Sequence, residues 1–218
     1  MIQQIKNLLA PYYACLWRDQ MIPAQVSTLR NLAEKSARDG MCILEIGSWC
    51  GCSSAILGRV ARAHDGRLVC VDWWRGLMGE RAVWLERLTD PYRQFRKRVM
   101  AEGLEDTVIS MRGRSEKVLP LLAEKSFDFI FIDADHRYAR ALCDMQYARR
   151  LIRPGGTICG HDCETIPTPE NKQDLERNRN QDFVDGVHAG VVLAVYDAFG
   201  ADGYEIENSI WFTKSNHL

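Results

Sequence analysis

Short apolar runs alternate with helical stretches along most of this chain, and this alternation restricts the fold more than any other feature. Runs without internal polar alternation are typical of parallel strands that are covered on both faces. Strands that alternate with helices predict an α/β fold. The predicted strands are 42–46, 68–72, 107–111, 127–133 and 157–160. The predicted helices are 53–63, 92–102, 138–152 and 190–199.

The two ends of the chain depart from this alternation. Runs 204–207 and 210–213 are separated only by Asn208-Ser209, which predicts an antiparallel hairpin. Residues 1–39 are predicted to form two helices that divide near Ile22-Pro23, either as a cap over the sheet or as an oligomer contact. We therefore expect an N-terminal helical extension, 1–39, and one domain, 40–218, with a homodimer through the N-terminal helices as one expected assembly.

A polar segment, 163–186, contains two prolines and few aliphatic residues. This composition predicts an exposed, mobile loop. The segment follows a predicted strand end, where ligands bind in α/β sheets.

Composition excludes several classes of protein. The 218 residues are 46% hydrophobic and 26% charged, and 28 basic against 29 acidic residues give a net charge of −1. This balance argues against nucleic acid or an anionic membrane as the main partner. Several of the eight cysteines lie in apolar runs, as free thiols do in a reducing compartment. With no signal-peptide pattern and no run of ~20 apolar residues, we expect a cytoplasmic location.

The loop after the first predicted strand indicates a cofactor site. Glu45 lies near the end of that strand, Gly47 and Gly51 bracket a turn that includes Ser48, and Ser53 opens the next helix. Glycines serve where backbone approaches a ligand or needs a positive φ. The Gly-x-x-x-Gly spacing differs from the dinucleotide pattern Gly-x-Gly-x-x-Gly. An acidic mouth favours an ammonium or sulfonium over phosphate, although an ordinary strand–turn–helix would also explain the loop.

The next two strand ends extend this interpretation. Asp72 ends the second predicted strand, where a carboxylate can accept both ribose hydroxyls. Trp73 and Trp74 follow directly and are expected to flank an adenine, unless they pack beneath a helix. Ser115, after the third strand, is expected at the adenine edge.

A second constellation follows the fourth and fifth strands, which carry Asp133, His136, His161 and Asp162. If these strands are neighbours, the two aspartates converge on one divalent ion, for which oxygen ligands favour Mg²⁺. A metal acidifies a bound hydroxyl, and His136, with an imidazole pKa near neutrality, then accepts its proton. Taken singly, such side chains are more often loop caps and hydrogen-bond partners than ligands, and it is the grouping of all four at neighbouring strand ends that favours a functional role.

These motifs together resemble class I S-adenosylmethionine-dependent methyltransferases. The resemblance rests on Leu44-Glu45-Ile46-Gly47 with Gly51, on Asp72, and on runs 127–133 and 151–156, and it covers roughly residues 40–215. It implies a Rossmann-like fold whose seven-stranded sheet is mostly parallel with an antiparallel last strand. The expected cofactor contacts are Glu45, Gly47, Ser48, Gly51, Ser53, Asp72, Trp73, Ser115 and Asp133.

Runs 132–136 and 155–162 are more specifically similar to metal-dependent small-molecule O-methyltransferases, in the branch of macrolide-sugar and cephalosporin biosynthesis. The resemblance implies Mg²⁺ on Asp133 and Asp162 and His136 as general base, with Asp133 also catalytic. That branch usually has Glu where this chain has His161, and a His ligand would favour Mn²⁺, Fe²⁺ or Zn²⁺. The expected function is methyl transfer to a hydroxyl of a sugar or natural product. An NAD-linked oxidoreductase or a catalytically silent cofactor-binding protein are the alternatives.

Overall fold

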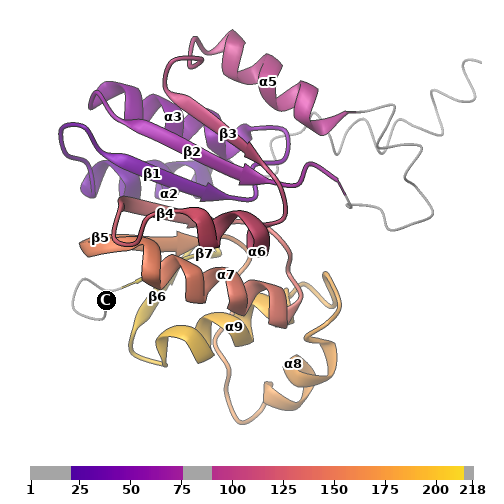
Figure 1. The fold of residues 1–218 in the computed structure, drawn as a ribbon. Helices are drawn as coiled ribbons and strands as arrows, with labels where there is room; N and C mark the ends of the chain where they lie inside the picture. Colours follow the sequence, from indigo (N-terminus) through magenta and orange to yellow (C-terminus); the bar gives the residue numbers. More distant parts are fainter. Residues whose placement is uncertain (1–20, 76–89, 214–218) are drawn as a thin grey trace, which may run out of the picture.

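The computed structural model describes residues 21–75 and 90–213. In this part of the chain seven strands form one sheet in the order β3-β2-β1-β4-β5-β7-β6 (Figure 1). The strands are β1 Cys42–Ile46, β2 Arg67–Asp72, β3 Val108–Arg112, β4 Phe127–Ile132, β5 Ile152–Gly160, β6 Tyr204–Glu207 and β7 Ile210–Thr213. The helices are α2 Pro23–Lys35, α3 Cys52–Ala63, α5 Pro91–Ala101, α6 Ser115–Val118, α7 Tyr138–Leu151, α8 Lys172–Asn178 and α9 Ala189–Phe199, with a 3-10 turn at Leu119–Leu121.

The sheet is parallel from β3 to β5, and β7 runs antiparallel to both of its neighbours. The predicted hairpin joins β6 to β7, and its two turn residues have positive φ, 54° at Asn208 and 62° at Ser209. Such values match the twist of a tight hairpin. The predicted fold class, with its antiparallel last strand, is confirmed.

Helices cover both faces of the sheet, which explains why its central strands are apolar throughout. Every residue of β4 is buried. One face packs with α2, α3 and α5 in a cluster that includes Leu29, Leu57 and Phe131. The other packs with α7 and α9 in a cluster that includes Ile130, Met145 and Val192. Burying each such side chain stabilises the fold by about 1.5–3 kcal/mol.

The border between α7 and β5 lies earlier than predicted. The helix ends at Leu151, and β5 begins at Ile152 instead of residue 157. The extra strand residues pair irregularly, because the register with β4 shifts between Phe127 and Phe129. Pro154 and two glycines lie within this irregular stretch, so they form a bulged strand instead of the simple break that the sequence predicts.

The polar segment 163–186 is not the structureless loop that the sequence predicts. It contains α8, and Leu175 of this helix is buried. A single apolar residue among many charged ones gives too little periodicity to reveal a seven-residue helix. The short helix α6 was missed for the same reason.

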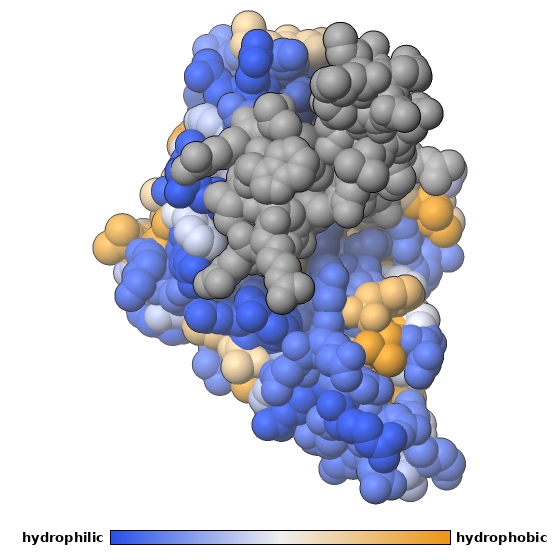
Figure 2. Space-filling model, turned by 90° about the vertical axis from the view of Figure 1, so that its right-hand side faces the viewer, coloured by the Kyte–Doolittle hydropathy of each residue, from blue (hydrophilic) through white to orange (hydrophobic). Residues whose placement is uncertain are grey.

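Of the two predicted N-terminal helices, the first lies outside the described residues. The second is α2, which packs on α3 and β7 and so covers the sheet as predicted. The proposed dimer contact through these helices, and the division at residue 39, stay predictions. No helix in the described ranges is long and apolar enough to cross a membrane. The described residues that are visible in Figure 2 are mostly hydrophilic, with separate apolar areas among them.

Candidate functional site

The carboxyl ends of the parallel strands open into a cavity of about 710 Å³. This is the sheet edge at which α/β folds bind ligands. The predicted site residues that line it are Gly47, Ser48, Ser53, Asp72, Trp73, Ser115, Asp133 and His136. Glu45, Gly51, His161 and Asp162 are not among its lining residues. The first loop, the second strand end and the start of the metal constellation therefore share one cavity.

At Gly47 the backbone of the first loop packs directly against the backbone of Asp133. The φ of Gly47 is +88°, and a Cβ there would lie 1.9 Å from the carbonyl oxygen of Asp133. Its N–H donates to the carbonyl of Val71 at 2.9 Å. Only glycine fits this position, as the sequence pattern indicates. Gly51, with φ +83°, caps the start of α3 and packs beside Phe95.

Glu45 does not form the acidic mouth that the sequence predicts. Its side chain is fully buried beneath the loop, where Oε2 accepts hydrogen bonds from Ser48 Oγ at 2.6 Å, from Ser54 Oγ, and from Cys70 Sγ at 3.2 Å. Burial raises its pKa. Strand alternation explains the error, because Glu45 points into the layer beneath the loop instead of toward the cavity.

Asp72 provides the carboxylate at the cavity wall. Its Oδ2 accepts the backbone N–H groups of Ser48 and Trp49, both at 2.8 Å, so it ties the first loop to the end of β2. Trp73 is 37% exposed, and the guanidinium of Arg114 lies over its ring at 4.0 Å. Trp74 is buried against Tyr92 and Phe95. Only one of the two tryptophans is therefore available to a ligand.

Ser115 lines the cavity from the start of α6 and lies near a buried acid. This acid is Asp144 of α7, which is 2% exposed. Burial raises the pKa of Asp144 to about 7, and the nearby Asp135 and Glu116 add to the effect. The sequence does not single out Asp144, which lies in the middle of a helix.

The predicted metal ligands lie together. Asp133 follows β4 and Asp162 follows β5, and these strands pair with Ile132 opposite Gly160. His161 Nδ1 lies 3.0 Å from Asp162 Oδ1 and 3.9 Å from Asp133 Oδ1. One ligand atom from each of the three residues lies within 4.8 Å of the others. Burial alone would lower the pKa of His161, but the hydrogen bond to Asp162 and the negative charges of Asp133 and Asp162 raise it to about 9.

His136 faces several carboxylates. Its Nε2 lies 3.0 Å from Asp162 Oδ2 and 4.0 Å from Asp133 Oδ1, and its Nδ1 lies 2.6 Å from Asp182 Oδ1. Burial alone would lower its pKa, but these hydrogen bonds outweigh burial and raise the pKa to about 12. The same contacts hold the pKa of Asp162 well below its usual range, against its burial. Without a metal ion, these contacts favour the protonated imidazole, and the role of His136 as a base beside a bound metal stays a prediction.

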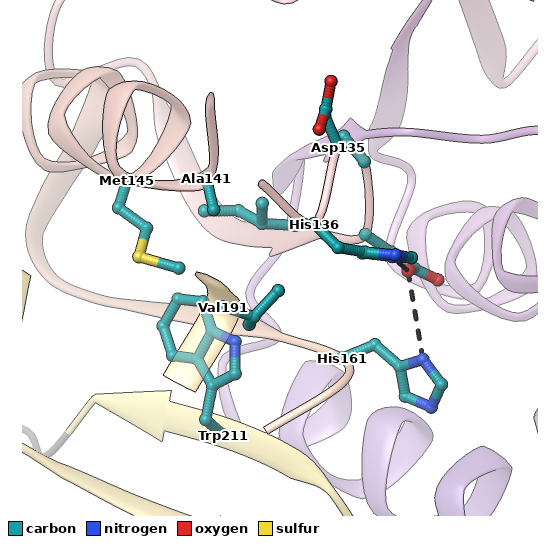
Figure 3. Close-up of a pocket in the computed structure, with 10 residues that line it drawn as sticks. Asp135, His136, Ala141, Met145, His161, Val191 and Trp211 are labelled. Carbon is teal, nitrogen blue, oxygen red and sulfur yellow. Dashed lines mark ion pairs between the residues drawn. The ribbon is translucent and has the colours of Figure 1, made fainter. Parts of the chain in front are cut away.

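A small second cavity of about 10 Å³ lies behind these residues. His136 and His161 border it on one side, and Met145, Val191 and Trp211 form its apolar side (Figure 3). His161 Nε2 and Trp211 Nε1 are both buried without a hydrogen-bond partner. The space is large enough for about one water molecule.

Three residues of this cluster were missed by sequence reasoning. His188 Nδ1 lies 2.7 Å from Glu164 Oε1, and its ring centroid lies 4.5 Å from that of His136. Asp182 binds His136 from the polar segment. Two signals were present: Glu164 is two residues past Asp162, and His188 directly precedes an apolar helix.

Comparison with known proteins identifies the fold's relatives. The model of a family described as "Methyltransferase domain" matches residues 44–163, more than half of the chain. This range includes the first loop, Asp72 and the ends of β4 and β5.

Solved structures with the same fold cover nearly the whole chain. Cofactor-bound Rv0187 from MTB is 22% identical with a TM-score of 0.66, over 99% of this chain and 90% of that one. The O-methyltransferase from Bacillus cereus in complex with SAH is 22% identical with a TM-score of 0.62, over 94% and 87%. TomG, an O-methyltransferase from Streptomyces achromogenes involved in tomaymycin synthesis and solved with SAM, is 21% identical with a TM-score of 0.59, over 98% of both chains.

Proposed function

The chain belongs to the methyltransferase domain family, and from that premise we propose that it transfers the methyl group of S-adenosylmethionine to a hydroxyl of a small molecule. One observation carries the proposal: the first loop and the Asp133–His136 segment line the same cavity. A methyl donor on the loop would lie next to the residues that handle an acceptor hydroxyl. The O-methyltransferase from Bacillus cereus, solved with SAH, and the O-methyltransferase TomG, solved with SAM, support the same reaction.

The cofactor would lie along the loop and the end of β2. Backbone at Gly47 and Ser48 would approach its methionyl part, the exposed ring of Trp73 would stack on adenine, and Ser115 would meet the adenine edge. Asp72 would accept the ribose hydroxyls, and its existing backbone bonds already fix its orientation. Such fixed groups would increase the reaction rate by holding the cofactor in position, because proximity supplies much of the acceleration in a two-substrate transfer.

A divalent cation fits the residues at the ends of β4 and β5. Two carboxylates and one imidazole offer ligand atoms within 4.8 Å of one another, and the His161 nitrogen that faces both carboxylates is Nδ1. Asp133, His161 and Asp162 would hold the ion. When bound, a cation there would orient the acceptor hydroxyl and lower its pKa.

His136 would accept the hydroxyl proton as the oxygen attacks the methyl carbon and the carbon–sulfur bond breaks. Its raised pKa favours the protonated imidazole while the charges of Asp133 and Asp162 are not offset. Positive charge near these aspartates would offset them and free Nε2 to act as a base. Asp182, bound to Nδ1, would keep the ring oriented.

The acceptor would be a sugar or natural product, as the involvement of TomG in tomaymycin synthesis suggests by analogy. The polar segment contributes Asn180 and Asp182 to the cavity wall. These polar side chains suit an acceptor with several hydroxyl groups.

The test is a methyl-transfer assay with labelled S-adenosylmethionine against a panel of hydroxylated sugars and phenols. We expect His136→Ala to lower kcat by roughly 10²–10⁴ while S-adenosylmethionine affinity changes little. His64→Ala, which removes an imidazole paired with Glu34 on another part of the fold, is the matched control. Thermal stabilisation by NAD instead of S-adenosylmethionine would overturn the proposal in favour of an oxidoreductase. Cofactor binding without transfer to any acceptor would favour a silent binding protein.

A further inference from the structure

The chain that follows α8 reaches the wall of the large cavity at two positions. Residues 179–182 come directly after this helix, and Asn180 and Asp182 among them line the cavity of about 710 Å³. His136 lines the same cavity. α8 itself packs on α9 (Figure 1). The stretch therefore leads from a packed helix to the wall on which His136 lies.

Arg179 fixes the beginning of this stretch to the start of α7. Its carbonyl accepts the N–H of Tyr138 at 2.9 Å, and its guanidinium lies 5.0 Å from the centroid of the Tyr138 ring. A Cβ built on Gly190 would lie 2.5 Å from the carbonyl oxygen of Arg179 and 2.3 Å from that of His136. Both carbonyls therefore face the same point of α9, so the backbone next to Asn180 lies beside the backbone of His136.

Asp182 fixes the end of the stretch to the same histidine. Its Oδ1 lies 2.6 Å from Nδ1 of His136. Asn180 is one residue from Arg179 and two residues from Asp182, and two residues of extended chain span only about 7 Å. Asn180 is therefore held near His136 from both sides.

The amide of Asn180 is uncommitted, unlike the polar side chains around it. Among the described residues, its side chain makes no hydrogen bond or ion pair, and the residue is exposed. Each of its polar neighbours within residues 177–182 has a partner in the segment or on His136. The pairs are Arg177 with Asp174, Asn178 with Gln181, Arg179 with Glu176, and Asp182 with His136.

The chemistry of an amide indicates what it can bind. A side-chain amide offers both donors and an acceptor, whereas a carboxylate only accepts and a guanidinium only donates. It therefore matches a hydroxyl group in either orientation and has no charge to attract an anion. The hydroxyl to be methylated would lie at His136, so the group that meets Asn180 would be a second hydroxyl of the same molecule.

We propose that Asn180 determines acceptor specificity by hydrogen-bonding a second hydroxyl, so that the enzyme selects polyhydroxylated acceptors such as sugar rings over molecules with one hydroxyl. The inference rests on the proposed function for the position of the first hydroxyl. A site that hydrogen-bonds a substrate hydroxyl discriminates against the analogue that lacks it. Because Asn180 is exposed, this discrimination should be the factor of about 3–10 that one ordinary hydrogen bond provides.

Transfer of a labelled methyl group to defined acceptors tests the inference. The full chain is assayed with S-adenosylmethionine, Mg²⁺ or Mn²⁺, and four kinds of acceptor: methyl α-D-glucopyranoside, its monodeoxy analogues, cyclohexanol and phenol. Wild type should use the glucoside with a kcat/KM about 3–10-fold above that for at least one monodeoxy analogue. Asn180→Ala should lower kcat/KM for the glucoside by the same factor, chiefly by raising KM, and should lose this preference. Its affinity for S-adenosylmethionine should stay within about twofold.

Asn178→Ala is the matched control. Asn178 is the same residue type two positions earlier, binds Gln181 and does not line the cavity, so its replacement should leave kcat/KM and the preference unchanged. Three results would overturn the inference: an unchanged preference in Asn180→Ala, an equal loss in Asn178→Ala, or wild-type transfer to cyclohexanol or phenol as efficient as to the glucoside. Binding of S-adenosylmethionine without transfer to any of these acceptors would instead overturn the proposed function on which the inference rests.

Discussion

Asp144→Asn should make the protein more stable at neutral and alkaline pH, although it removes a native side chain from the core. Asp144 is 2% exposed, and burial is the main reason that its pKa rises to about 7. Two acids, Asp135 and Glu116, add to the rise, whereas the hydroxyl of Ser115 and the charge of Arg140 oppose it. The asparagine side chain has nearly the same shape as the acid and carries no charge.

The pH dependence of this stability gain follows from the difference in the pKa of Asp144 between the folded and unfolded chains. The folded chain binds the proton of Asp144 more tightly than the unfolded chain does. Asp144 therefore does not destabilise the protein below its ordinary pKa of 3.8, destabilises it increasingly as the pH rises, and has its full destabilising effect above about pH 7. At about 1.4 kcal/mol per pKa unit, the loss is at most about 4 kcal/mol. The variant lacks this loss, so its advantage should be near zero at pH 4 and about 2–4 kcal/mol at pH 8.

Urea unfolding of both proteins at pH 4.5, 6 and 8 measures this advantage directly. Asp106→Asn, which changes an exposed carboxylate, is the control and should show no pH-dependent difference from wild type. An Asp144→Asn advantage that is below about 0.5 kcal/mol at pH 8, or that is the same at all three pH values, would refute the reasoning. Either result would mean that Asp144 is not a buried, destabilised charge.

Two more substitutions test a backbone contact and a hydrogen-bonded ion-pair network that support the fold. Gly47→Ala would place a Cβ 1.9 Å from the Asp133 carbonyl oxygen, so it should lower the free energy of unfolding by more than ~2 kcal/mol and weaken S-adenosylmethionine binding. The control is Gly155→Ala, where φ is +79° but nothing lies within 4 Å, and it should lower the free energy of unfolding by only about 1 kcal/mol. Equal urea midpoints for the two variants would contradict the predicted clash. Asp128→Ala leaves Arg38, Arg153 and the Cys42 N–H without their shared acceptor and should lower the free energy of unfolding by about 3 kcal/mol. The control is Glu124→Ala, which breaks an exposed ion pair with Arg150 and should lower it by under about 1 kcal/mol. If Asp128→Ala is no more destabilising than Glu124→Ala, the Asp128 network contributes little to stability.

The sequence predicted the fold well because backbone topology leaves periodic signals. Apolar runs without alternation identified β1, β2 and β4, and a two-residue connection identified the β6–β7 hairpin. The helix α8 left no such signal, since a short helix with one buried leucine is outweighed by its charged residues. Boundaries next to the Pro154 bulge also failed, because a strand can begin irregularly where a proline would end a helix.

Site residues were predictable where a strand end positions them, and not where tertiary packing does. Asp133 and Asp162 follow neighbouring parallel strands, so their convergence follows from topology alone. His188 reaches Asp162 only because α9 packs on α7, a contact between helices that no local pattern records. Glu45 shows the opposite error, because a correct motif does not say on which side of its strand a carboxylate lies.

The contact between Gly47 and Asp133 explains how the first loop and the ends of β4 and β5 keep a fixed distance from each other. The carbonyl of Ile46 accepts the N–H of Asp133 at 2.8 Å, and the next residue, Gly47, packs directly on the Asp133 carbonyl. The loop proposed to hold the methyl donor and the carboxylate proposed to hold the acceptor's metal are thus joined by adjacent peptide groups of β1 and β4. Both strands are buried in the centre of the sheet, so side-chain motion elsewhere changes this separation little. Transfer between two bound groups depends steeply on their distance, and here that distance is set by backbone hydrogen bonds instead of by flexible side chains.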